Sequence, residues 1–254
     1  MTLIIGLVDG GQVHFESDSL ITQRWLPEGC DANSIDLKLQ PKVRLFSDER
    51  FVVAAAGNPD PLFELARDHL QTKWELEQLR DHLLFVHRQT LQNGGSDTDF
   101  LLGCADPISL FAFKRGNCRC VEMEEFIGDE VAYNWLAEKR AEPIGSLTPE
   151  TRIGRLSHEF PYALNHPEFP SVGGVNIGLQ SYKGRFHFKK RTFQTASFVF
   201  ELNDFLGIDP NSFESLSFVP IDDGKKLRVC FPESERCYEF QIQDDGSQLP
   251  VQVS

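Results

Sequence analysis

The sequence predicts an α+β protein, a four-layer αββα sandwich in which helices cover the outer faces of two antiparallel sheets. Three observations lead to this fold class. The chain starts with two hairpin patterns, it continues with apolar residues at a helical period, and it then alternates short strand patterns with helix patterns up to a last hairpin. Two sheets packed on each other, with helices outside, would bury all of these apolar faces.

The first two hairpins are predicted within residues 2–57. Residues 2–8 and 12–19 flank a turn at 9–11, where Asp-Gly and Gly-Gly supply the positive φ angles that a tight hairpin needs. The second hairpin, over residues 42–57, repeats the order of strand, short polar turn and strand. We therefore expect the chain to begin inside a strand.

The segment between the two hairpins, residues 20–41, has no clear period and contains several breakers. We expect it to form a loop. Trp25 and Leu26 within it either pack into the core or line a substrate cleft.

Helix and strand patterns alternate from residue 58 onward. Apolar positions with a period of about 3.6 predict helices over 60–70 and 72–92. His87 lacks metal-ligand spacing from other histidines, so we expect it at the surface or on a helix face. The remaining segments are expected as strands at 98–105, 108–113 and 118–123, helices over 129–139 and from 148, and strands at 174–181 and 185–192.

Composition limits the function classes. The net charge of −13 over 254 residues argues against nucleic acid and against an anionic membrane as partners. The sequence has no long apolar run and no signal peptide pattern, so we expect a cytoplasmic protein. It has no phosphate-binding loop and no H-E-x-x-H or paired-cysteine metal motif, and we expect no cofactor and no metal.

Two cysteines near the end of the chain are spaced to face each other. Cys230 and Cys237 would lie on opposite strands if residues 232–235 form a hairpin loop. A disulfide would fit that geometry, but a reducing compartment favours free thiols, and we expect thiols.

The second residue of the chain carries the chemistry of most interest. Removal of Met1 would leave Thr2 with a hydroxyl and a free α-amine, a nucleophile and a base on one residue. A lysine nearby would lower the pKa of both groups, and an aspartate would hold that lysine in place. Asp18 ends the partner strand and Lys42 opens the next one; Lys38 is a rival for Lys42 but lacks the strand context.

These residues resemble the proteasome β-subunit family and its bacterial heat-shock peptidase relatives, which are N-terminal-nucleophile hydrolases. The resemblance rests on Thr2, Asp18-Ser19, Lys42-Val43 and Ala56-Gly57, at matching spacings. It implies the αββα sandwich and four roles: Thr2 as nucleophile, Asp18 and Lys42 as its support, and the Gly57 N–H as oxyanion donor. An extended substrate would then pair with backbone near Ser19, Leu20 and Ile21.

The resemblance covers roughly residues 2–192 and weakens toward its end. Residues 126–139 are similar to the family's Ile-Gly-Ser-Gly helix start, but Asp129 stands where a serine is expected. We expect Asp129 to cap that helix. Glu168-Phe-Pro-Ser171-Val-Gly-Gly is similar to the family's Asp-x-x-Ser-Gly-Gly element, with Glu for Asp and one added residue. By resemblance, Glu168 and Ser171 support the amine.

The resemblance implies a threonine-type hydrolase of peptide or amide bonds, with peptide or protein substrate. It also implies a homo-oligomeric ring and an unfoldase partner. The alternative is a catalytically inactive proteasome-like subunit that serves as an oligomeric assembly or binding module. We divide the chain into a hydrolase domain at 1–192 and a partly β extension at 193–254 packed on the same domain, which would cover an edge, make a subunit contact or bind a partner.

Overall fold

The structure is a computed structural model, and it describes part of the chain. The described residues are 2–18, 42–57, 73–92, 98–142, 151–164, 166, 168–169, 171–173, 175–189, 192–194, 199–201, 217–221, 226–231, 236–242 and 248–252. The predicted helix over 60–70, the loop at 20–41 and the residues Trp25 and Leu26 lie outside these ranges.

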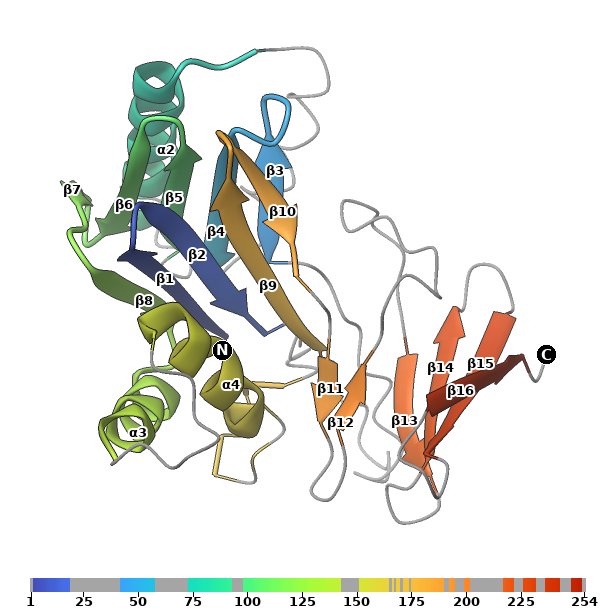
Figure 1. Ribbon diagram of the computed structural model, residues 1–254. Coiled ribbons are helices and arrows are strands. Elements are labelled where there is room, and N and C mark those ends of the chain that lie inside the picture. The colour runs from blue at the N-terminus through green and yellow to red at the C-terminus, as the bar shows by residue number, and fades with distance from the viewer. Residues whose placement is uncertain are drawn as a thin grey trace.

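Two antiparallel sheets form the body of the molecule (Figure 1). The first sheet has the order β12-β11-β9-β2-β1-β8, and β10 pairs with β9. Its strands are β1 (Leu3–Asp9), β2 (Gln12–Ser17), β8 (Glu124–Gly128), β9 (Val175–Tyr182), β10 (Arg185–Phe188), β11 (Thr192–Gln194) and β12 (Val199–Glu201). The second sheet has the order β3-β4-β5-β6-β7. Its strands are β3 (Val43–Phe46), β4 (Phe51–Ala56), β5 (Asp99–Ala105), β6 (Ile108–Lys114) and β7 (Asn117–Cys120).

Three described helices cover the outer faces of these sheets: α2 (Leu76–Gln92), α3 (Glu130–Ala141) and α4 (Arg152–Ala163). In Figure 1, α2 lies against the second sheet, and α3 and α4 lie against the first. Asp129 caps α3 by accepting from the backbone N–H groups of Val131 and Ala132, as expected, and Thr151 caps α4.

Side-chain alternation along the strands produces the layers. On β1, Ile4 faces the second sheet and packs in the core between the sheets, together with Phe15 and Leu101. The neighbouring positions Leu3, Ile5 and Leu7 face the other way, against α3 and α4. Phe100 of the second sheet packs on α2 in the same manner. The four layers are therefore α2, the second sheet, the first sheet, and the α3–α4 pair, which confirms the predicted sandwich.

The close approach of the two sheets depends on a glycine. A Cβ on Gly103 would lie 2.5 Å from the ring of Phe15, which is fully buried. Phe15 also meets Phe186 edge-to-face, with ring centroids 6.1 Å apart. Gly103 thus leaves room for a large aromatic ring between the sheets.

A third sheet of four strands, with the order β13-β14-β15-β16, follows the body. Its strands are β13 (Ser217–Ile221), β14 (Lys226–Phe231), β15 (Arg236–Ile242) and β16 (Gln248–Gln252). The first sheet continues beyond residue 192, because β11 and β12 extend it next to β9. Packing of the third sheet on the same domain stays a prediction.

Several local expectations were wrong. The single strand expected at 118–123 is the end of β7, and the chain then crosses to the first sheet as β8, which pairs with β1. The polar residues 243–254, for which the sequence predicts a loose tail, contain β16, which pairs with β15. His87 does lie on a helix face, but on the buried face of α2 and not at the surface; the carbonyl of Thr98 and the N–H of Gly116 satisfy its ring nitrogens there.

The cysteine expectation also needs correction. Cys237 is disulfide-bonded, and Cys230 is the residue opposite it in the register of β14 and β15. The hairpin brings these two backbone positions together, and this proximity favours a disulfide even where the assumed compartment would disfavour it.

No described helix is long and apolar enough to span a membrane.

Candidate active site

The β1–β2 hairpin places Thr2 beside Asp18. In its antiparallel register Ile4 lies opposite Ser17, and the N–H of Asp18 donates to the carbonyl of Leu3 at 3.1 Å. The start of one strand therefore meets the end of the other. Both side chains are buried, with Thr2 3% exposed and Asp18 fully enclosed.

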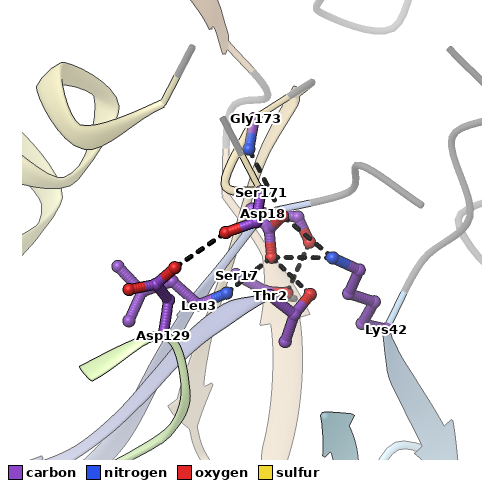
Figure 2. A network of polar contacts seen from close by, with 8 residues as sticks. All are labelled: Thr2, Leu3, Ser17, Asp18, Lys42, Asp129, Ser171 and Gly173. Atoms are coloured by element: carbon purple, nitrogen blue, oxygen red, sulfur yellow. Dashed lines mark hydrogen bonds and ion pairs between the residues drawn. The ribbon is translucent and has the colours of Figure 1, made fainter. Parts of the chain in front are cut away.

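Asp18 is the centre of a network of hydrogen bonds (Figure 2). Its Oδ1 accepts from the Thr2 hydroxyl at 2.8 Å and from the N–H of Leu3 at 2.9 Å. Lys42 Nζ donates to Oδ1 at 3.0 Å and to Oδ2 at 2.9 Å. The N–H of Gly173 donates to Oδ2 at 3.4 Å. Both oxygens of this buried carboxylate therefore accept hydrogen bonds, and those from Lys42 are charge-assisted.

Lys42 reaches the network from the second sheet. It directly precedes β3, and its carbonyl accepts from the N–H of Ala55 on β4 at 2.9 Å. Stacking of the two sheets then brings the lysine against Asp18 of the first sheet. Burial lowers the pKa of Lys42, and the ion pair with Asp18 opposes that change. An ammonium group and the Thr2 hydroxyl thus share one oxygen, Asp18 Oδ1.

The expected oxyanion donor follows β4. Gly57 is exposed and has a φ of 109°, a conformation that glycine adopts with little strain. It lies two residues after Ala55, the residue that bonds the backbone of Lys42. The predicted substrate-binding residues Ser19, Leu20 and Ile21 lie outside the described residues.

A second group of polar residues holds Thr2 from the side of α3. The N–H of Asp129 donates to the Thr2 carbonyl at 2.6 Å, and the preceding Gly128 has a φ of 103°. A Cβ on Gly128 would lie 1.9 Å from that carbonyl oxygen, so a side chain has no room there. The hydroxyl of Ser171 donates to Asp129 Oδ2 at 2.7 Å.

The structure separates the two residues that resemblance assigned to the amine. Ser171 joins the site through Asp129. Glu168 is exposed, and its backbone N–H donates to His166 Nδ1. The reason is local: Phe169 is 2% exposed and packs on Trp135, which directs the neighbouring Glu168 outward. No contact between the Glu168 carboxylate and the network is found in the described part of the chain, and its predicted role has no geometric support.

The site roles of Asp129 and Gly173 are not predicted by the sequence. The sequence predicts Asp129 only as a helix cap, and Gly173 only as part of the segment that resembles the family's Asp-x-x-Ser-Gly-Gly element. The substitution of Asp for the expected serine was the available signal, since a carboxylate accepts several hydrogen bonds where a hydroxyl accepts fewer. In the part of the chain that the structure describes, no three His, Cys, Asp or Glu side chains are grouped to hold a metal ion.

The two antiparallel sheets with helices on both outer faces are a fold that this chain shares with solved structures of proteasome-like Anbu proteins. The chain is similar in structure to an Anbu (Gly-1) mutant from Hyphomicrobium sp. strain MC1, with a TM-score of 0.55 and 17% identity over 77% of this chain and 88% of that one. It is also similar to Anbu (ancestral beta-subunit) from Yersinia bercovieri, with a TM-score of 0.51 and 16% identity over 74% and 87%. No protein-family model and no curated protein sequence matches the chain.

Proposed function

We propose that this protein is a threonine-type N-terminal-nucleophile hydrolase that cleaves peptide or amide bonds. The observation that carries the proposal is the contact of both the Thr2 hydroxyl and the Lys42 ammonium with one buried carboxylate, Asp18. A hydroxyl held by a carboxylate that also binds a buried ammonium is a suitable setting for an activated nucleophile. The fold shared with the Anbu structures supports the same interpretation.

Activity requires removal of Met1. The α-amine of Thr2 then becomes free, and an α-amine titrates near ~7.7–8, so a fraction is neutral at neutral pH. The positive charge of Lys42 favours the neutral amine and the deprotonated hydroxyl. Burial lowers the pKa of Lys42. As the pH is raised, Lys42 therefore loses its activating charge at a lower pH than a solvated lysine would.

Catalysis proceeds through an ester intermediate. Thr2 Oγ forms a bond to the scissile carbonyl carbon while the Thr2 amine, directly or through a water, takes the hydroxyl proton. The tetrahedral intermediate collapses, the carbon–nitrogen bond breaks, and the leaving amine takes that proton. A water then attacks the ester, which releases the carboxylic acid and restores the Thr2 hydroxyl.

The remaining roles follow from the resemblance. The Gly57 N–H stabilises the oxyanion, a contact whose loss costs roughly 3–4 kcal/mol in other enzymes. The substrate lies extended and pairs with backbone at Ser19, Leu20 and Ile21 and with the strand leading into Gly57. We expect peptide or protein substrates, assembly in a homo-oligomeric ring and an unfoldase as partner.

The test uses intact mass and hydrolysis on a chain that begins at Thr2, prepared from a cleavable fusion. A peptide epoxyketone, which needs both the hydroxyl and the amine, should add once to this chain. Thr2→Ala should add none and should lower kcat/KM for a fluorogenic peptide at least about a thousandfold. Lys42→Ala should lower kcat/KM while the far-ultraviolet circular dichroism stays unchanged.

The matched control is Thr151→Ala, which removes the cap of α4 and leaves the site unchanged. It should keep both adduct formation and hydrolysis. Unchanged hydrolysis by Thr2→Ala would refute the proposal. A native protein that retains Met1, forms no adduct and still assembles would favour the alternative, a catalytically inactive assembly or binding module.

A further inference from the structure

Asp129 makes more contacts than a helix cap requires. Its Oδ1 accepts from the N–H groups of Val131 and Ala132, each at 3.0 Å, and this pair of bonds caps α3. Its Oδ2 is turned to another partner, the hydroxyl of Ser171 at 2.7 Å. Its own N–H donates to the Thr2 carbonyl at 2.6 Å. One residue therefore joins the start of α3, the turn at Ser171 and the backbone of Thr2.

The position of Asp129 relative to Thr2 is tightly set. Gly128 lies opposite Leu3 in the β1–β8 register and permits no side chain next to the Thr2 carbonyl. In Figure 2, Asp129 and Ser171 lie on one side of the Thr2–Asp18 pair, and Lys42 lies on the other. Asp129 is also only 7% exposed, so little water screens its charge. Thr2 thus has the Asp129 carboxylate on one side and the Lys42 ammonium on the other, with the Asp18 carboxylate in direct contact with its hydroxyl.

The geometry points to Asp129 as a positioning residue that, through Ser171, orients the α-amine of Thr2. This inference rests on the proposed function and assigns to the α3 cap the support that resemblance assigned to Glu168. The hydroxyl hydrogen of Ser171 is committed to Asp129, so its oxygen is left to accept. An N–H of the Thr2 amine can donate to that oxygen, which fixes the amine and leaves its lone pair for the Thr2 hydroxyl.

The electrostatic consequence separates this role from a purely structural one. A negative charge close to an amine favours its protonated form and raises its pKa, whereas Lys42 has the opposite effect. Three buried charges face Thr2: Asp129 and Asp18 favour the protonated amine, and Lys42, which is ion-paired to Asp18, acts against them. Removal of the negative charge of Asp129 should lower the pKa of the amine, and it should move the acidic limb of kcat/KM to lower pH.

The experiment is an NMR titration of the α-amine in the full chain beginning at Thr2, labelled with ¹⁵N-threonine, together with the pH profile of kcat/KM. Asp129→Asn removes the charge and keeps a side chain that caps helices as well as aspartate does. We expect the amine to titrate about one pH unit lower in this variant. Ser171→Ala, which removes the acceptor, should shift the amine in the same direction.

Thr151→Ala is the matched control, because it removes a helix cap outside the site. It should leave the titration of the amine unchanged. An amine that titrates alike in the wild type and in Asp129→Asn would overturn the inference. The titration needs no turnover. If Asp129→Asn shifts the amine as expected and the wild-type chain hydrolyses nothing, the proposed function is refuted and the role of Asp129 stands.

Discussion

Two buried carboxylates near the end of β2, Asp18 and Glu16, are satisfied in different ways. Both oxygens of Asp18 accept hydrogen bonds, from side chains and from backbone N–H groups. Glu16 is equally buried, and its Oε1 lies 2.7 Å from His14 Nε2. Its Oε2 has no hydrogen-bond partner among the described residues, and neither has His14 Nδ1.

The surroundings of Glu16 come from the helix side of the first sheet. Ser157 of α4 lies 3.2 Å from His14 Nε2, and Lys189 donates to the Ser157 hydroxyl at 3.2 Å. Burial alone would raise the pKa of Glu16, but His14, Ser157 and Lys189 together lower it. Burial lowers the pKa of the half-buried Lys189, and Glu16 opposes that change. This cluster attaches α4 to β2.

The difference shows what a site needs beyond burial. At Asp18 the bonds come from both sheets and from the backbone, so the Thr2 hydroxyl has one defined orientation. At Glu16 only some of the polar atoms have hydrogen-bond partners. These bonds suffice to attach α4 to β2, but they fix the orientation of the Glu16 and His14 side chains less tightly. We therefore expect substitutions at Asp18 to have larger effects than matched ones at Glu16.

The largest effect is expected for Asp18→Asn. This variant leaves the buried ammonium of Lys42 without its counter-charge, and breaking a buried ion pair in this way costs about 3–5 kcal/mol. Urea unfolding followed by tryptophan fluorescence measures the free energy of unfolding. A cost equal to or below that of Glu16→Gln would show that the fully paired network adds nothing to stability.

The next effect concerns the backbone that holds Thr2. Gly128→Ala places a Cβ against the Thr2 carbonyl at a φ of 103°, and we expect a loss of roughly 2–4 kcal/mol. Gly10→Ala is the control, since Gly10 also has a positive φ but has no atom within 4 Å of its added Cβ. It should cost only about 1 kcal/mol in the same unfolding measurement. If Gly128→Ala and Gly10→Ala lose the same free energy of unfolding, the backbone around Thr2 moves to accommodate the added Cβ without cost.

The sequence predicted the parts of this site that depend on local pairing. The hairpin turn at 9–11 sets the register of β1 and β2, and that register places Thr2 beside Asp18. The contact with Lys42 needs the stacking of two sheets, which no local pattern specifies, and here the family resemblance supplied the prediction. The positions of Gly57 and Ser171 came from the same source.

Other parts depend on pairings that are distant in the chain. Asp129 meets Thr2 only because β8 pairs with β1, and β8 was missed because its two glutamates obscure the strand pattern. His87 was expected at the surface or on a helix face, since nothing near it in sequence reveals that the backbone at Thr98 and Gly116 satisfies both ring nitrogens. Buried polar groups with backbone partners leave little trace in a single sequence.

A smaller effect is expected for Glu16→Gln, which removes charged hydrogen bonds worth about 1.5–3 kcal/mol. The pKa of Glu16 is lowered in the folded protein, so its stabilisation is complete above the ordinary value of 4.5 and is lost as pH falls through the folded value. The stability difference between wild type and variant should therefore narrow below about pH 4.5. Melting temperatures from pH 7 to pH 3 test this, and a constant difference would contradict it.

The smallest effect is expected for Ser157→Ala, which removes one hydroxyl from the half-paired cluster and should cost about 1 kcal/mol. Because this serine attaches α4 and touches no residue of the Thr2 network, kcat/KM and its pH profile should not change. Ser171→Ala removes a hydroxyl of the same size but should move the acidic limb of that profile. If the two serine variants have the same effect on the profile, the two buried clusters do not differ in the way their hydrogen bonds indicate.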